Sequence, residues 1–563
     1  MSLTKVSYSM ISGAPYNAVD YGADITGVAD STTAIQAALD AAGAAGGGVV
    51  VLPAGTYKYS FLVMKYPKVT LIGSGDSTIL SSTQDFTTAH RPNIWVAANN
   101  CTVDSVYMTY QSWNSTNLTS LLTTRPSANS YFGSQISVGY INLYTTPGSG
   151  VYNTVYGVTL SVIYNTTIRN VRTLGSAIHG MTLLNAVGSR VQNCNLQQFK
   201  GTGIWGYNAP QSLIQGNNLQ ISGDDAVFIG SNSVSWSGYY TPLTGADMVD
   251  VSITENYCAK IGAKGFCAPG YNTVVIANNV VNETRAAAIW IGEEPTDNTP
   301  AATQAQITGN ALYNCFGSFG TAANGYYYST DIVTATSGIY YAISADSCTD
   351  FTVANNVVLL SSKITTQIQS TRYGFGNLNI KRVSVCNNVF SGFVRGNIGA
   401  ETAITPVASD VNFTGNIVDA LSASNSPRLV QVGYNADTIK IVGNNFRSVA
   451  SATGGFAIIY NLTGAKSFSA SNSFDLANGV AAYSNGGTTL IANQDNYDIT
   501  FFSDITGTSL SKRVFWLSAA PTTGTWNQGD QVWNTAPASG GTPGWVCTTA
   551  GTPGTWKAMA NLA

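Results

Sequence analysis

Short apolar stretches, separated by Gly, Asn and Ser, run through most of the chain and predict many short strands joined by tight turns. One segment differs, because residues 31–45 have the spacing and composition of an amphipathic helix, and Asp30 and Ser31 stand where capping residues are expected. The glycine run 46–48 ends this helix, and the apolar run 49–57 predicts a strand directly after it. The pattern therefore predicts an all-β chain with one short helix near its N-terminus.

The body of the chain repeats one phrase, in which an apolar strand ends in Asn, often doubled, and another apolar residue follows. Asn tolerates the left-handed backbone that a tight corner needs, and its amide can bond to the Asn of the next rung. Such repeats with loop insertions are typical of a solenoid, so we expect these residues to be structural corner residues. The recurring positions are Asn217, Asn256, Asn278, Asn310, Asn355, Asn387, Asn416, Asn444 and Asn472.

Composition excludes several classes of function. Charged residues make up 9% of the 563 residues, the net charge is -3, and no basic run exists, so nucleic acid is not an expected partner. No apolar stretch is long enough to cross a membrane, and the N-terminus lacks the apolar core of a secretory signal. The eight Cys are scattered singly, and we interpret them as buried apolar residues. We therefore expect neither a metal site nor a cofactor.

Residues 18–57 carry a specific resemblance. They begin AVDYGAD, continue through the predicted helix, and end GGGVVVLPAGTY. This arrangement is similar to the N-terminal cap of pectate-lyase-like β-helix proteins. The resemblance implies a right-handed parallel β-helix over residues 18–500, with the helix covering the open edge of the first rung.

The last part of the chain, residues 501–563, departs from the repeat. It is punctuated by Gly and Pro and predicts a linker followed by a small β module with an aromatic core. Two interpretations have about equal weight: a functional module, for trimerisation or sugar binding, and a folded end cap. The aromatic residues are Trp526, Trp533, Trp545 and Trp556.

Residues 150–300 contain the rungs that we expect to carry catalysis. Aligning their apolar positions gives an inward column and, because strand side chains alternate, a neighbouring outward column. An outward column forms a long groove floor suited to a linear polysaccharide, with aromatic faces for sugar rings; a contact with another subunit or loop is the alternative. The inward column is Ile178, Ile204, Val227, Phe266 and Ile289, and the outward column is His179, Trp205, Phe228, Cys267 and Trp290.

The segment 222–230, SGDDAVFIG, carries the sharpest local signal. It resembles the G-D-D strand of polygalacturonase-type glycoside hydrolases, in which both aspartates are catalytic. The resemblance implies that Asp224 and Asp225 supply the two carboxyl groups that glycoside hydrolysis needs. An Asx-turn entering a strand is the alternative. Because adjacent strand residues face opposite sides, both carboxyl groups reach one cleft only if the chain bends there.

The rest of that family's pattern is altered. The chain has Gly-Thr-Gly at 201–203 where the family has N-T-D, and Lys264 stands where the family has His one rung later. A replacement acid is expected at Glu293 or Glu294, about 10 Å from Asp225 at ~4.8 Å per rung, near the upper limit of ~6.5–9.5 Å for inversion. Lys264 introduces a second chemistry, because it could bind an acidic sugar or act as the base in β-elimination.

Further substrate contacts are expected beside these groups. Arg285, on the rung after Lys264, could neutralise a uronate. The insertion that follows the G-D-D strand would overhang the groove, and long loops on repeats commonly carry binding residues. The full set of expected substrate-binding residues is Trp205, Tyr207, Trp236, Tyr239, Trp290, Arg285 and His179.

The chain as a whole resembles phage tailspikes that degrade bacterial capsule or O-antigen. The resemblance implies a homotrimer on the virion tail, attached to other tail or adaptor proteins through the short N-terminal segment 1–17. Three activities stay open. The first is an endo-acting glycoside hydrolase using Asp224 or Asp225. The second is a polysaccharide lyase using Lys264 or a Tyr as base, and the third is a non-catalytic adhesin.

Overall fold

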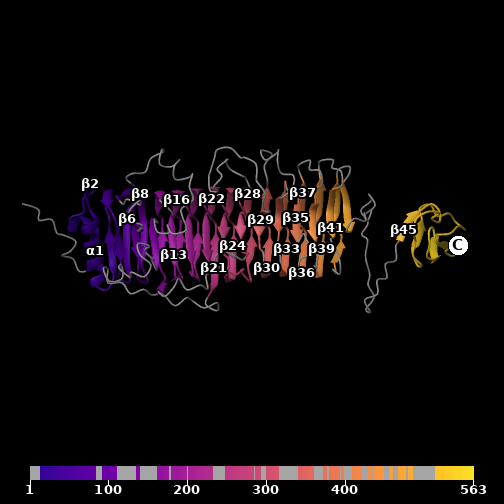
Figure 1. Ribbon diagram of the computed structural model, residues 1–563, viewed down its shortest axis with the longest axis horizontal. Coiled ribbons are helices and arrows are strands. Elements are labelled where there is room, and N and C mark those ends of the chain that lie inside the picture. The colour runs from indigo at the N-terminus through magenta and orange to yellow at the C-terminus, as the bar shows by residue number, and fades with distance from the viewer. Residues whose placement is uncertain are drawn as a thin grey trace, which may run out of the picture. The chain divides into compact units, whose positions relative to one another are not determined.

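The computed structural model forms two compact units, one built on the chain up to Ile491 and one built chiefly on the chain from Ala492 onward. In the first unit, Figure 1 shows strands stacked along one axis from α1 to β41. The structure describes residues 13–83, 92–110, 135–139, 162–176, 179–199, 201–231, 248–284, 286–292, 300–315, 340–345, 347–359, 372–376, 380–392, 395–398, 409–420, 428–432, 437–448, 455–460, 467–476, 480–485 and 514–562.

From β11 onward, each described coil of the first unit has three strands and two corners: a leading strand, a corner, a middle strand, a second corner, and a trailing strand. Strands of successive coils pair in parallel, so three ladders run along the molecule. The leading ladder consists of β11 (Thr167–Arg169), β15 (Arg190–Gln192), β18 (Leu213–Gln215), β21 (Val249–Thr254), β24 (Asn272–Ala277), β27 (Gln306–Thr308), β30 (Thr349–Ala354), β33 (Lys381–Cys386), β36 (Ser409–Thr414), β39 (Asp437–Val442) and β42 (Ser467–Ala470).

The middle and trailing ladders complete the coils. The middle ladder consists of β12 (Arg172–Ser176), β16 (Asn195–Phe199), β19 (Asn218–Ser222), β22 (Tyr257–Ile261), β25 (Val280–Thr284), β28 (Ala311–Cys315), β31 (Val357–Leu359), β34 (Val389–Ser391), β37 (Ile417–Ala420), β40 (Asn445–Ser448) and β43 (Ser473–Leu476). The trailing ladder consists of β5 (Leu62–Met64), β7 (Ile94–Val96), β9 (Ile136–Gly139), β13 (Met181–Leu184), β17 (Ile204–Tyr207), β20 (Val227–Gly230), β23 (Phe266–Cys267), β26 (Ile289–Trp290), β29 (Tyr340–Ser344), β32 (Arg372–Gly376), β35 (Arg395–Ile398), β38 (Arg428–Val432), β41 (Gly455–Tyr460) and β44 (Val480–Asn485). This topology confirms the predicted parallel β-helix.

The N-terminal end carries the predicted helix. Helix α1 (Thr32–Ala44) buries Ile35 and Leu39 against the first coils, while the backbone N–H of Thr32 donates to Asp30 Oδ1 at 2.8 Å. Gly43 is required here, because a Cβ at this position would lie 2.2 Å from the ring of Tyr66. The remaining elements near this end are β1 (Tyr16–Asn17), the 3-10 helix η2 (Ala18–Tyr21), β2 (Thr26–Asp30), β3 (Gly48–Val51), β4 (Gly55–Tyr59), β6 (Val69–Ser82), β8 (Thr102–Tyr110) and the pair β10 (Ile163–Tyr164) and β14 (Ala186–Val187).

The corner between leading and middle strands holds a continuous ladder of buried Asn side chains. Asn279 shows the pattern: its Oδ1 accepts from the Asn256 backbone N–H at 2.9 Å, and its Nδ2 donates to Asn310 Oδ1 at 3.0 Å. The prediction was wrong by one residue at Asn278, Asn355 and Asn387, which take the left-handed corner backbone while the Asn that follows each of them enters the ladder. At Asn217 and Asn444 a preceding Gly takes the left-handed backbone, so the predicted Asn itself enters the ladder. The ladder is Asn217, Asn256, Asn279, Asn310, Asn356, Asn388, Asn416 and Asn444.

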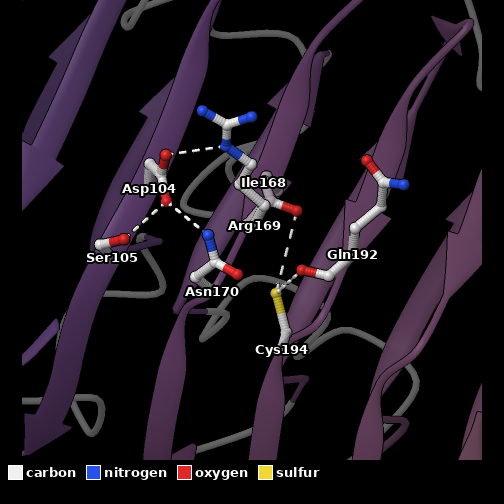
Figure 2. Close-up of polar contacts among 7 residues, drawn as sticks. All are labelled: Asp104, Ser105, Ile168, Arg169, Asn170, Gln192 and Cys194. Atoms are coloured by element: carbon white, nitrogen blue, oxygen red, sulfur yellow. Dashed lines mark hydrogen bonds and ion pairs between the residues drawn. The ribbon is translucent and has the colours of Figure 1, made fainter.

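Cys194 occupies the ladder position one coil before Asn217 (Figure 2). Its Sγ lies 3.8 Å from the Ile168 carbonyl oxygen of the preceding coil, just as the Asn217 amide donates to the Val191 carbonyl oxygen of its own preceding coil. Burial raises the pKa of this thiol to about 12, so it stays protonated and can donate. Figure 2 also shows Asp104, whose carboxylate accepts from Arg169 Nε at 2.7 Å and from Asn170 Nδ2 at 2.9 Å, so it ties two successive coils together.

The second unit is a four-stranded sheet of β45 (Val514–Leu517), β46 (Gln531–Asn534), β47 (Gly544–Thr549) and β48 (Thr555–Ala558). Val532 and Cys547 are buried on one face, where Trp526 packs edge-to-face on Trp556 with ring centroids 5.1 Å apart. The predicted aromatic core is therefore confirmed for these two Trp residues. It is wrong for Trp533, which lies on the other face and is 40% exposed.

Candidate active site

The trailing ladder places the predicted columns beside each other. Ile204, Val227, Phe266 and Ile289 pair directly from coil to coil, and all four are fully buried in the main core. Their neighbours along the strands form an outward column, which we call the aromatic column. It consists of Trp205, Phe228, Cys267 and Trp290. The alignment of these four coils is therefore confirmed.

The aromatic column is packed rather than open, except at Trp290, which is partly exposed. Trp205, Tyr207, Phe228 and Cys267 form a hydrophobic cluster separate from the main core, and only 7%, 5%, 6% and 0% of their surfaces are exposed. The rings of Trp205 and Tyr207 meet edge-to-face at 5.1 Å. The expectation of an exposed groove floor is wrong at these positions, because strand alternation decides which side of the sheet a residue faces but not what covers it.

A four-residue corner joins the middle and trailing strands in each of these coils. Four residues separate Phe199 from Ile204, and the same number separates the register-matched Ser222 from Val227. The corners therefore stack in register, and in the last four of them the carbonyl oxygen at the third position accepts a backbone N–H from the preceding coil. We call the third positions the corner column, which consists of His179, Thr202, Asp225, Lys264 and Ala287.

Asp225 is the carboxylate of the corner column, and the corner supplies the bend that the G-D-D segment requires. It is 6% exposed, and its Oδ1 accepts the backbone N–H of Lys264 at 2.7 Å. Ser222 Oγ donates to the carbonyl oxygens of Asp224 and Asp225, which braces the turn. Asp224 is partly exposed at the same corner. Two adjacent carboxyl groups thus lie at one edge of the trailing sheet, one largely buried and one accessible to solvent.

Lys264 and Trp290 form the accessible side of the site. Both side chains are partly exposed, and Lys264 Nζ lies 3.7 Å from the centroid of the Trp290 ring. A cation over the face of an indole is stabilised in its charged form. The pair therefore places a fixed positive charge one coil beyond Asp225.

His179 is displaced from its predicted position. In the outward column the partner of Trp205 is Thr182, so the alignment was wrong by three residues in this coil. His179 belongs to the corner column instead, and its ring stacks on Trp205 at 5.1 Å with an interplanar angle of 5°. Burial lowers the pKa of His179 to about 3, and Nδ1 accepts the Thr202 N–H at 3.0 Å. His179 is therefore a neutral packing residue at neutral pH.

Five of the predicted site residues lie outside the described residues: Trp236, Tyr239, Arg285, Glu293 and Glu294. Within the described part of the chain, no group of three or more His, Cys, Asp or Glu residues is arranged to hold a metal ion. Over the same residues, no helix has the length and apolar character to cross a membrane.

Sequence reasoning missed the groups that hold the site in place. Ser222 braces the G-D-D corner, and Thr284, two coils on, donates to the Ala286 carbonyl oxygen at 2.8 Å in the same way. Thr202 stands in the corner column one coil before Asp225 and is 1% exposed. The available signal was the equal spacing of the corners, which becomes visible only when the coils are aligned on both flanking strands.

Comparisons with known proteins agree with this architecture. Residues 16–287 match the family described as rhamnogalacturonase A/epimerase, pectate lyase-like, and this match covers the corner column. Mannuronan C5-epimerase AlgE1 of Azotobacter vinelandii is 64% identical over 45 residues, which are 8% of this chain and 3% of the epimerase. The chain thus spans a very small part of that relative.

Two phage proteins are among the similar solved structures. The N-terminal fragment of bacteriophage phi29 gene product 12 has a TM-score of 0.59 at 12% identity, over 89% of this chain and 74% of that fragment. Tailspike protein 3 of bacteriophage CBA120 has a TM-score of 0.46 at 12% identity, over 100% of this chain and 72% of that protein. The first match and the family match confirm the predicted right-handed, pectate-lyase-like β-helix.

Proposed function

We propose that the chain binds a bacterial surface polysaccharide and hydrolyses its glycosidic bonds at the corner column. The observation that carries this proposal is the pair Asp224 and Asp225 at a bent corner, with Asp225 fixed by the Lys264 N–H at 2.7 Å. Glycoside hydrolysis needs two carboxyl groups, one that protonates the leaving oxygen and one that activates water or attacks the sugar. The family match supports the proposal because it spans these residues.

The two carboxyl groups have different environments, which is what an acid and a base require. Asp225 is held inside the corner, whereas Asp224 is partly exposed. Glu293 and Glu294 stay candidates for a third carboxyl group, because they follow Trp290 closely in the sequence. In this mechanism Lys264 and the exposed face of Trp290 bind the sugar on the far side of Asp225. Tyr207, Trp205 and His179 support the site by packing behind it.

A lyase is the second candidate, and Lys264 is the observation that favours it. Its position in the corner column, next to Asp225, suits recognition of an acidic sugar. Its Nζ lies 3.7 Å from the centroid of the Trp290 ring, which holds the side chain at the accessible side of the corner. Lys264 would therefore neutralise the sugar carboxylate, as Arg285 would, and a Tyr would act as the base.

Product analysis tests the two candidates. Purified chain is incubated with capsular and O-chain polysaccharides, and the fragments are analysed for reducing ends and for ultraviolet absorbance. New reducing ends without an unsaturated chromophore support the hydrolase. An unsaturated product replaces it with the lyase, and intact polymer throughout means that the chain is an adhesin.

We also propose that the chain works as the β-helix of a homotrimeric phage tailspike, attached to the tail or an adaptor through residues 1–17. The sequence resemblance supports this context, and an apolar stripe on the middle ladder supports the assembly. In six successive coils the first outward residue of the middle strand is apolar, whereas the outward positions of the leading strands in those coils are mostly polar. The stripe is Tyr257, Val280, Ala311, Val357, Val389 and Ile417.

Mass measurement tests the assembly. Ile417, 41% exposed, is replaced by Lys, and Asn412, exposed on the leading strand of the same coil, is replaced by Lys as the matched control. Light scattering of the parent should give three chains, and Ile417→Lys should lower the mass because a charge would be buried in the contact. A monomeric parent, or equal masses for both variants, would contradict the proposal.

A further inference from the structure

The outer face of the C-terminal sheet presents two neighbouring indoles. Trp516 of β45 pairs directly with Trp533 of β46, so both side chains point to the same face of the sheet. They are 55% and 40% exposed, which makes them the most exposed Trp residues in the described part of the chain. We call this pair the Trp platform.

The Trp platform lies on the opposite face of the sheet from the buried Val532 and Cys547. On the opposite face, Trp526 Nε1 donates to the Thr523 carbonyl oxygen at 2.7 Å, and Trp556 Nε1 donates to the Pro553 carbonyl oxygen at 3.2 Å. Those indoles are fixed edge-to-face within the module. Of the five Trp residues in the module, Trp526, Trp545 and Trp556 lie on the face that holds its core, and Trp516 and Trp533 lie on the other.

Two kinds of position surround the Trp platform on its face of the sheet: a glycine on the adjacent strand, and a neighbouring row that includes polar side chains. Gly544 pairs with Trp533 on the next strand, and a Cβ there would lie 2.2 Å from the Val532 carbonyl oxygen, so this position stays without a side chain. The neighbouring row on the same face contains Val514, Gln531, Val546 and Lys557. An amide and an ammonium group thus lie within one row of two aromatic faces.

We propose that the Trp platform is a glycan-binding site, separate from the cleavage site of the β-helix. Pyranose rings present flat faces of C–H groups that pack on indoles, while their hydroxyl groups need partners such as the Gln531 amide. Adjacent strands lie ~4.8 Å apart, close to the length of one sugar residue. The platform therefore suits two consecutive residues of a polysaccharide, neutral or acidic.

The size of the platform argues against a protein partner. Two half-exposed indoles offer on the order of 100 Å² each, whereas a stable protein interface buries about 800 Å² on each side. A second attachment point on the same polymer would raise the local concentration of substrate without any new contact at the cleavage site. This role does not depend on which chemistry the β-helix performs.

The test uses the full chain carrying Asp225→Asn, applied to an array of bacterial capsular and O-chain polysaccharides. The array identifies the bound polymer, and titration with it gives the affinity. Trp516→Ala with Trp533→Ala should weaken binding at least about tenfold. Trp516→Tyr with Trp533→Tyr keeps two aromatic faces and should restore most of the affinity.

Val514→Thr is the matched control, because it removes apolar area from the same face without removing a ring. Unchanged affinity in the double Ala variant, or no bound polymer on the array, would overturn the proposal. A lower mass of the double Ala variant in light scattering would also overturn it, because the platform would then be a subunit contact. If the parent chain cleaves no polysaccharide, the proposed glycan site is not affected, because this test measures binding.

Discussion

The β-helix and the C-terminal module place the same residue type at outward strand positions with opposite results. Trp205 stands on the outer side of the trailing ladder, yet it is 7% exposed and packs against His179 and Tyr207. Trp516, also outward on its sheet, is 55% exposed. Alternation along a strand decides the side of the sheet, and the neighbouring residues decide whether that side meets water.

This difference separates two functions of aromatic residues. In the β-helix the rings of Trp205, Tyr207 and Phe228 pack against one another beside the corner column. In the module the rings are available to a ligand. We therefore expect substitutions of the β-helix rings to alter stability, and substitutions of the module rings to alter binding.

The largest expected effect is at the corner. Asp225→Asn keeps the acceptor for the Lys264 N–H but removes the ionisable group. The rate of reducing-end formation should fall ~10²–10⁴-fold, while polymer binding through the Trp platform persists. Asn412→Asp, a charge change on the leading ladder, serves as the control and should leave the rate unchanged. Near-full activity in both Asp225→Asn and Asp224→Asn would move the site elsewhere.

The next effect compares the two Trp environments directly. Trp205→Ala leaves a cavity in a packed cluster and should lower the free energy of unfolding by ~3–5 kcal/mol. Trp516→Ala lies on an exposed face and should change it by less than ~0.5 kcal/mol. Thermal midpoints of the parent and both variants measure the contrast. Equal midpoints for the two variants would show that the aromatic column adds no packing energy.

A smaller effect distinguishes the two residues of a doubled Asn. Asn279→Ala removes a buried side chain that bonds to both neighbouring coils, at 2.9 Å and 3.0 Å. Each buried group left unsatisfied costs ~1–3 kcal/mol. Asn278→Gly keeps the left-handed backbone and should be nearly neutral. Denaturant midpoints of the two variants measure this difference in stability. A larger loss of stability in Asn278→Gly than in Asn279→Ala would contradict the Asn ladder.

The smallest effect is a pH dependence that comes from His179. Its folded-state pKa, about 3, lies below its usual value of 6.5, so between these values only the unfolded chain takes up a proton. The contribution of His179 is fully present above pH 6.5 and is lost as the pH falls, by at most ~1.4 kcal/mol per pH unit. His179→Phe should flatten the stability profile between pH 6.5 and about 4. An unchanged slope would mean that the ring is not buried.

The sequence allowed the fold to be predicted because its signals are local and repeated. The helix expected at 31–45 is Thr32–Ala44, and the apolar columns from Ile204 to Ile289 are in register. The errors arose where two solutions fit one local pattern. Either Asn of a doubled pair can fit the ladder, and only the backbone decides. The coil of His179 was aligned with Ile178 opposite Ile204, whereas Met181 is the residue that pairs with Ile204. Both residues are apolar and only three positions apart, so the sequence pattern fits either alignment.

Exposure was the property that the sequence could not provide. Whether Trp205 or Trp533 meets solvent depends on residues far away in the sequence, which no periodicity reports. The role of Ser222 was equally invisible, because a Ser before Gly-Asp-Asp is common in turns and its two carbonyl contacts exist only in the folded corner.

The most direct measurement of the central claim is a crystal structure of the Asp225→Asn chain with an oligosaccharide of the polymer that the parent cleaves. The account predicts that the scissile bond lies against Asp224 and the Asn at position 225, with the next sugar on Lys264 and Trp290. An oligosaccharide bound at the apolar stripe of the middle ladder, or anywhere remote from the corner column, would contradict it.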